Sequence, residues 1–252
     1  MANWNDGRNS RTGFGPQSGL NAGAHSGATG IVQDAGLRKH MLSIYNYMAS
    51  GVLLTGVVAM LFAASGLAAQ VLGGGLLTWI IMLSPLGFVL AMSFGANKFS
   101  AATLQIMFWA YSAAMGLSLS SIFLIYTGES IALTFFATAG AFAGLSLFGY
   151  TTKKDISGWG SFLIMGVVGL IIASLLNAFL IGSPGLELAI SALGVLIFAG
   201  LTAYDTQRLK AEYSYVRGTP MAKKSVILGA LSLYLDFINM FLFLLRFMGN
   251  RE

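Results

Sequence analysis

The sequence predicts an all-α membrane protein that forms a bundle of seven transmembrane helices. The composition is the first reason: 56% of the 252 residues are apolar and only 9% are charged, whereas soluble domains have about 25% charged residues. The second reason is a series of seven apolar runs, each long enough to cross a hydrocarbon core of ~30 Å at ~1.5 Å per residue. Membrane strands are excluded because these runs are continuously apolar and do not alternate.

The predicted spans follow one another with short interruptions. They cover residues 41–65, 76–94, 101–126, 131–149, 161–181, 188–209 and 225–248. The breaks contain residues that favour turns, such as the three glycines at 73–75 and the Gly-Ser-Pro-Gly segment at 182–185. Residues 41–252 are therefore expected to form one membrane domain.

Residues 1–40 differ from the rest of the chain. They are rich in Gly, Asn, Ser and Ala and contain no apolar run. No signal-peptide core is present, so the first span is expected to direct insertion. This composition predicts a disordered cytoplasmic tail, and a partner-binding segment is the alternative.

The basic residues predict the orientation of the spans. Lys and Arg occur in the tail, at Lys98, at Lys153 and Lys154, and between residues 208 and 224, whereas the three intervening loops contain none. The positive-inside rule then predicts a cytoplasmic N-terminus. Seven spans place the C-terminus outside, although Arg246 lies near it. A last segment that does not cross, with both termini cytoplasmic, is the alternative.

Several classes of chemistry are excluded by what the chain lacks. It has no Cys, so disulfides, thiol catalysis and Cys-based zinc sites are ruled out. Its two histidines, His25 and His40, both precede the apolar region, which leaves little for a metal site or a Ser-His triad. The net charge of +5 is spread around the apolar runs and forms no single patch. We therefore expect no metal, no cofactor and no nucleic-acid partner.

Acidic residues inside the spans are the strongest candidates for function. A carboxylate at the bilayer centre costs ~2.5–3.5 kcal/mol, so its presence needs a reason. Asp205 in the sixth span and Asp236 in the seventh are the two such acids. The residues on one helical face of the seventh span are Ser232, Asp236, Asn239 and Arg246. This stripe is expected to face the bundle or a wet cavity; a purely structural hydrogen-bond cluster is the alternative.

Asp205 has local partners of its own. Thr202 and Arg208 lie within one helical turn of it. An internal Asp205–Arg208 ion pair is therefore a competing explanation of the buried acid. In that case Asp205 needs no partner from another span.

A meeting of the two aspartates would create a pH switch. Two carboxylates in a medium of low dielectric constant cannot easily both ionise, so they would titrate as one unit. For them to meet, the sixth span must continue as a helix to about Tyr213, with Lys210 and Glu212 in a wet vestibule. No Gly or Pro interrupts that stretch.

The remaining small and polar residues of the spans are interpreted as packing. Gly140 and Gly144 form a small-xxx-small pair, which predicts a close helix contact in the fourth span. The lone amide of Asn177 is expected to be structural.

Two sequence strings resemble a known family. Residues 200–207 read Gly-Leu-Thr-Ala-Tyr-Asp-Thr-Gln, and residues 230–239 read Ala-Leu-Ser-Leu-Tyr-Leu-Asp-Phe-Ile-Asn. Both resemble motifs of the Bax-inhibitor family, also called the transmembrane Bax inhibitor motif family. The resemblance covers about residues 41–251 and suits the bacterial branch, which implies a location in the cell inner (plasma) membrane.

The resemblance implies a seven-helix fold with the last helix at the centre. It also implies a pH-sensitive leak of calcium or another cation, with Asp205 and Asp236 as the pair that senses pH and gates the path. One departure concerns gating. Some bacterial relatives carry a basic residue in the second span that contacts the pair, but residues 76–94 contain neither Lys nor Arg.

Two other functions remain open. One is a scaffold without transport that regulates partner membrane proteins or proteases. The other is an intramembrane aspartyl protease, for which the Tyr204-Asp205 pair fits. The second protease motif, Gly-x-Gly-Asp, and a Pro-Ala-Leu segment are both absent from the sequence. A protein that is not an enzyme is therefore expected.

Overall fold

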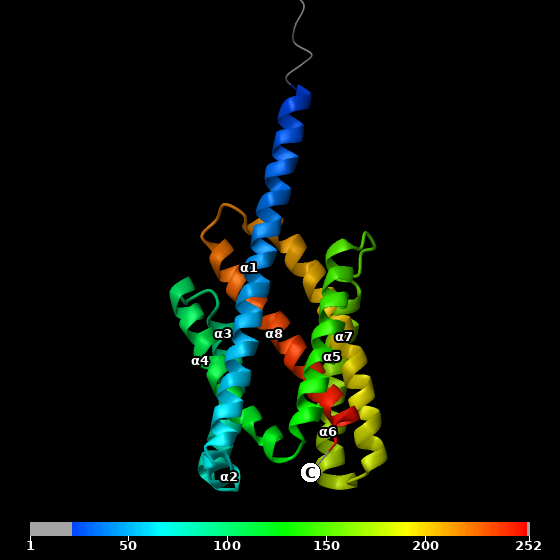
Figure 1. The fold of residues 1–252 in the computed structure, drawn as a ribbon. Helices are drawn as coiled ribbons and strands as arrows, with labels where there is room; N and C mark the ends of the chain where they lie inside the picture. Colours follow the sequence, from blue (N-terminus) through cyan, green and yellow to red (C-terminus); the bar gives the residue numbers. More distant parts are fainter. Residues whose placement is uncertain (1–21, 251–252) are drawn as a thin grey trace, which may run out of the picture. The chain divides into compact units, whose positions relative to one another are not determined.

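The computed structural model describes residues 22–250, with side chains from residue 35 onward. The chain divides into residues 1–38 and a larger membrane unit, residues 39–252. The described residues form helices and no strand. In chain order these are α1 (Ala22–Ala64), α2 (Leu67–Leu72), α3 (Leu76–Gly95), α4 (Ala101–Leu119), η1 (Ser120–Leu124), α5 (Gly128–Thr151), α6 (Trp159–Leu176), η2 (Asn177–Ile181), α7 (Pro184–Val216) and α8 (Met221–Met248) (Figure 1).

Seven helices of the described chain are long and apolar enough to cross a membrane, which confirms the predicted fold class. Each predicted span coincides with one of them. The largest differences are that the first candidate span begins at Ala35 and that α7 continues to Val216. Of the tail predicted over residues 1–40, residues 22–40 lie in α1 and residues 1–21 lie outside the described residues, so the disorder of residues 1–21 and the cytoplasmic location stay predictions.

Polar residues mark the beginnings of several helices. The hydroxyls of Ser100, Thr127 and Ser183 accept hydrogen bonds from backbone N–H groups in the first turns of α4, α5 and α7. Asn177 holds the turn before α7, because its side-chain amide donates to the backbone carbonyl of Ser183 and accepts from the backbone N–H of that residue. The structural role expected of Asn177 is confirmed.

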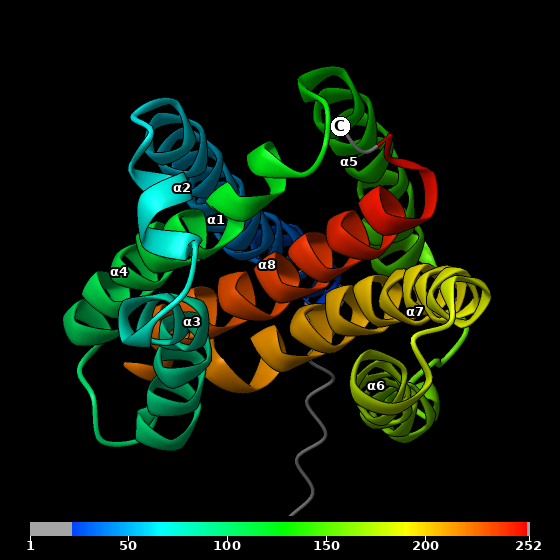
Figure 2. The ribbon, with the colours of Figure 1, turned by 90° about the horizontal axis from the view of Figure 1, so that it is seen from below.

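The last helix, α8, lies at the centre of the membrane unit. Figure 2 shows it running between the other helices, and α7, α5 and α4 pack against it. In its most apolar stretch 61% of the residues are buried, compared with 39% in α7 and less in the other spans. This confirms the central last helix that the family resemblance implies.

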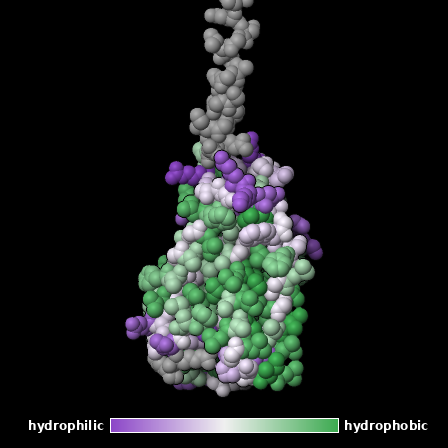
Figure 3. Space-filling model, turned by 90° about the vertical axis from the view of Figure 1, so that its right-hand side faces the viewer, coloured by the Kyte–Doolittle hydropathy of each residue, from purple (hydrophilic) through white to green (hydrophobic). Residues whose placement is uncertain are grey.

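The outer surface of the membrane unit suits lipid. On the face in Figure 3, hydrophobic residues form a broad band, and hydrophilic residues gather towards its two ends. Large exposed side chains such as Phe136, Phe162 and Leu196 contribute apolar surface that water would disfavour. Lipid is the solvent that matches this surface.

The close contact predicted at Gly140 and Gly144 is wrong. Both glycines are exposed, and a Cβ atom at either would meet nothing within 4 Å. The close approach is instead at Gly149, where a Cβ atom would overlap the backbone carbonyl of Ala203 in α7. The buried face of α5 includes Thr134, Thr138, Phe142, Ser146 and Gly149.

Candidate functional site

The structure brings the two predicted acids together. Asp205 on α7 and Asp236 on α8 are both buried, and these two helices share the most extensive contact in the bundle. The two carboxylates interact electrostatically with each other and with Arg208. The sixth and seventh spans therefore contribute to one cluster of ionisable side chains inside the apolar bundle.

The length of α7 makes this meeting possible. The helix runs without interruption from Pro184 to Val216, and no Gly or Pro lies between Thr202 and Arg217 to end it earlier. It ends where Arg217 adopts an extended backbone and Gly218 a left-handed one, with φ of 74°. Asp205 consequently lies well inside a continuous helix and faces α8.

Arg208 pairs with Asp205 and reaches α8 as well. Its Nη2 lies 3.2 Å from Oδ1 of Asp205 and donates a hydrogen bond of 3.2 Å to Oγ of Ser232. The Arg208 side chain is 46% exposed, whereas that of Asp205 is 11% exposed. The internal pair considered from the sequence is thus formed, with the guanidinium at the rim and the carboxylate inside.

Asp236 is the less satisfied of the two acids. Its Oδ2 is buried and has no hydrogen-bond partner among the described residues. Buried polar atoms are rarely left without a partner, and a buried carboxylate is the costliest kind. A proton, a water molecule or a cation at this oxygen would supply the missing interaction.

The other predicted polar residues have different surroundings. Ser232 accepts the bond from Arg208 and belongs to the cluster. Thr202 and Asn239 bond instead to carbonyls of their own helices, those of Phe198 and Leu235 respectively. They satisfy local backbone groups and make no hydrogen bond to the carboxylates.

Arg246 does not join the cluster, so the predicted stripe ends before it. It is exposed, and its guanidinium lies 5.7 Å from the ring centre of Phe243. Ten residues separate it from Asp236, which corresponds to ~15 Å along a helix axis. A shared helical face did not imply a shared site.

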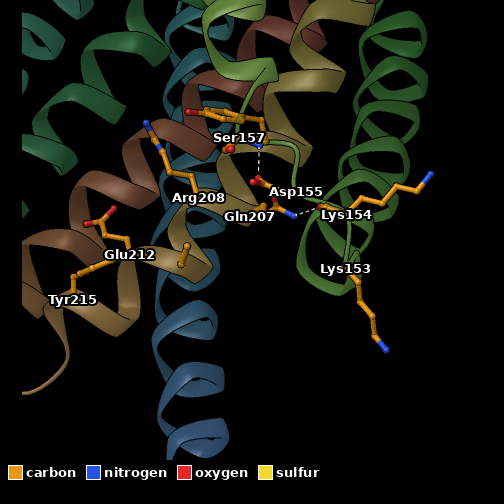
Figure 4. Close-up of a pocket in the computed structure, with 10 residues that line it drawn as sticks. Lys153, Lys154, Asp155, Ser157, Gln207, Arg208, Glu212 and Tyr215 are labelled. Atoms are coloured by element: carbon orange, nitrogen blue, oxygen red, sulfur yellow. Dashed lines mark hydrogen bonds between the residues drawn. The ribbon is translucent and has the colours of Figure 1, made fainter.

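A cleft of about 580 Å³ opens beside Arg208 (Figure 4). It lies between the α5–α6 loop and the last turns of α7, and its lining includes Lys153, Lys154, Asp155, Arg208, Glu212 and Tyr215. Glu212 thus lies in an open space of the kind predicted for it. Lys210 instead donates to the backbone carbonyl of Tyr150 in α5.

A second polar cluster on another face of α8 was missed from the sequence. The hydroxyl of Tyr234 lies 2.6 Å from Oγ1 of Thr55, which donates to the backbone carbonyl of Ser112. Tyr111 packs edge-on against Tyr234, and its buried hydroxyl has no partner among the described residues. Tyr234 is two residues from Asp236, so it projects from α8 in a nearly opposite direction. The spacing between Tyr234 and Asp236 was the feature of the sequence from which this second cluster could have been predicted.

Comparison with known proteins adds family membership to this geometry. Residues 37–252 match the family model described as inhibitor of apoptosis-promoting Bax1. The chain is 47% identical to the inner membrane protein YbhL of Escherichia coli, over 88% of this chain and 96% of that protein. It is 50% identical to an uncharacterized protein of Caulobacter vibrioides, over 87% and 92% of the two chains, and 46% identical to the uncharacterized protein RP147 of Rickettsia prowazekii, over the same shares. The chain therefore belongs to the Bax-inhibitor family.

Proposed function

We propose that this protein is a pH-sensitive cation leak of the bacterial inner membrane, with calcium as its permeant ion. Asp205 and Asp236 are the sensor and the gate. The observation that carries the proposal is the buried Oδ2 of Asp236, which has no partner among the described residues and lies in a cluster with the Asp205–Arg208 pair. The name of the Escherichia coli relative supports the location.

Protonation would change the force between α7 and α8. At low pH, a proton shared by the two carboxyls holds the helices together. When both carboxyls ionise, two charges 4 Å apart repel by ~4 kcal/mol at an effective dielectric constant of ~20. Arg208 offsets part of that repulsion, and a cation that enters the cluster offsets the rest. Leak is therefore expected to increase as the pH rises.

Arg208 is the proposed barrier at the end of the site predicted to be cytoplasmic. It lines the cleft and also binds Asp205, so it lies between that open space and the acid. A cation that entered through the cleft would have to displace the guanidinium. This role would replace the basic residue that is missing from α3.

Calcium flux into liposomes tests the proposal. The full chain is reconstituted with an enclosed calcium dye and assayed at several pH values. Asp205→Asn and Asp236→Asn should each alter the leak and flatten its pH dependence, and the double variant should add little, because the acids form one site. Glu129→Gln, which changes an exposed acid at the start of α5, is the control.

Two outcomes would contradict the proposal. Independent and additive effects of the two substitutions would refute a shared site. If all variants leave the flux unchanged while the Asp variants impair folding, as judged by size-exclusion chromatography, the cluster is structural. A scaffold without transport would then be the better description.

A further inference from the structure

We propose that the cleft between the α5–α6 loop and the end of α7 binds the phosphate headgroup of an anionic lipid. The proposal concerns binding alone and holds whether or not the protein conducts cations. The cleft has a volume of about 580 Å³, which accommodates a headgroup. Its basic lining residues are Lys153, Lys154 and Arg208 (Figure 4).

The loop that forms one wall is held firmly against α7. Oε1 of Gln207 accepts a hydrogen bond of 2.9 Å from the backbone N–H of Ile156, and its Nε2 donates one of 2.8 Å to the carbonyl of Lys154. The side chain of Ile156 is buried beneath the loop. These contacts fix the backbone from which both lysines extend. The loop backbone is thus fixed, and the two lysine side chains extend outward from it, on the side away from Arg208 (Figure 4).

The acids of the cleft already have partners. Asp155 accepts hydrogen bonds from Ser157, and these bonds lower the pKa of its carboxyl below the ordinary value. The Asp155 carboxylate therefore stays ionised and engaged with its own loop. Glu212 accepts a hydrogen bond of 2.7 Å from the hydroxyl of Ser225 in α8. Neither bond neutralises its carboxylate, so the lining holds three basic groups, Lys153, Lys154 and Arg208, against the charges of these two acids.

The basic groups, in contrast, have unused donors. Within residues 35–250, the ammonium groups of Lys153 and Lys154 make no hydrogen bond or ion pair. Arg208 bonds to Asp205 and Ser232 through the same nitrogen, Nη2. A phosphate offers several charged acceptor oxygens to lysine and arginine donors. The hydrogen-bond donors that remain free in this cleft thus belong to basic side chains, which suits the binding of an anion.

The surroundings favour a lipid as the source of that anion. Trp159 begins α6 directly after the loop, and its ring is exposed, as is that of Tyr215 at the end of α7. Such aromatic residues are enriched at the level of lipid headgroups. The next turn of α6 exposes Phe162, an apolar side chain suited to acyl chains. Basic pockets between helices at the cytoplasmic surface are a known form of anionic headgroup site.

Native mass spectrometry of the detergent-solubilised full chain measures binding directly. The probe is phosphatidylglycerol, and zwitterionic phosphatidylcholine is the comparison lipid. Lys153→Gln combined with Lys154→Gln should weaken retention of phosphatidylglycerol on the order of tenfold, since each basic residue near an anionic headgroup contributes measurably. Lys98→Gln combined with Lys223→Gln removes equal charge from exposed positions outside the cleft and should have little effect.

Three results would overturn the proposal. If both double variants lost phosphatidylglycerol to the same extent, the lipid would be held by the overall positive charge of the protein and not by the cleft. Displacement of the lipid by inorganic phosphate at similar concentration would make free phosphate the ligand. A photoactivatable phosphatidylglycerol should label residues 151–158 or 204–215 of the unmodified chain. Labelling confined to other segments would refute the site even if the variants failed to fold.

Discussion

Arg208→Gln is expected to destabilise the protein more than Asp205→Asn, although both changes remove the same ion pair. Without the guanidinium, the buried carboxylate of Asp205 loses its partner at 3.2 Å, and Asp236 loses a nearby positive charge. Without the carboxylate, the half-exposed Arg208 can turn towards water. The penalty therefore depends on which partner remains inside the bundle.

The burial of the Arg208–Asp205 ion pair determines how much stability is lost when it is broken. Breaking a fully buried ion pair costs about 3–5 kcal/mol, whereas an exposed pair contributes about 0.2–1 kcal/mol. The Arg208–Asp205 pair lies between these limits, with one side chain 46% exposed and the other 11%. We expect a loss of about 2 kcal/mol for Arg208→Gln, within the range for a hydrogen bond to a charged group, and about 1 kcal/mol or less for Asp205→Asn.

Equilibrium unfolding in detergent, followed by circular dichroism, measures both variants and the double variant. The double variant should be more stable than Arg208→Gln alone, because no unpaired carboxylate remains at position 205. In the flux assay, Arg208→Gln should increase leak, whereas Asp205→Asn should flatten its pH dependence. Equal destabilisation by the two single changes, with no coupling between them, would refute the reasoning.

The remaining predictions concern packing and orientation. Gly149→Leu should lower the free energy of unfolding by about 1–3 kcal/mol through overpacking against α7, whereas Gly144→Leu on the exposed face of α5 should lower it little. Thermal unfolding of the two variants measures this difference. Reporter fusions that are active only in the cytoplasm should be silent at Gly74 and Gly185 and active at Asp155, as the positive-inside rule requires. A signal at Gly74 would overturn the orientation, and a fusion at the C-terminus, expected outside, decides whether the last span crosses.

The number and order of the spans were predictable because long apolar runs are a strong signal. The bounds were less so, and α7 extends to Val216, past the predicted end at residue 209. Charged residues lower the hydropathy of its last turns, although helix geometry continues through them. The short helix α2 (Leu67–Leu72) also went unrecognised inside a connection.

Which face of each helix packs against the bundle was harder to predict than the presence of the helix. In a membrane, both the lipid side and the core side of a helix are apolar, so hydropathy does not distinguish them. The error at Gly140 and Gly144 has this cause: small residues indicate a possible close contact but not which face makes it. Gly149, next to Ala203 of α7, shares the buried face with Ser146.

The candidate site was predictable where its contacts are local. Asp205 and Arg208 are three residues apart on one helix, and that spacing raised their pair as an alternative, which the structure contains. Gln207 was missed because its partner Ile156 lies 51 residues earlier, in a loop. Arg246 lies outside the cluster although it was grouped with Asp236, because an angular comparison ignores the rise along the helix axis.

The arrangement of polar groups around α8 bears on the proposed pH response. Towards α1 and α4, the Tyr234 hydroxyl is joined to Thr55, and that hydroxyl pair does not ionise near neutral pH. Towards α7, the carboxyl of Asp236 keeps an unpartnered oxygen beside Asp205 and Arg208. In the proposed gate, a change of protonation alters the force between α7 and α8 and leaves the other contact unchanged. The proposed gate acts at the α7–α8 interface, while the bond between Tyr234 and Thr55 holds α8 in place.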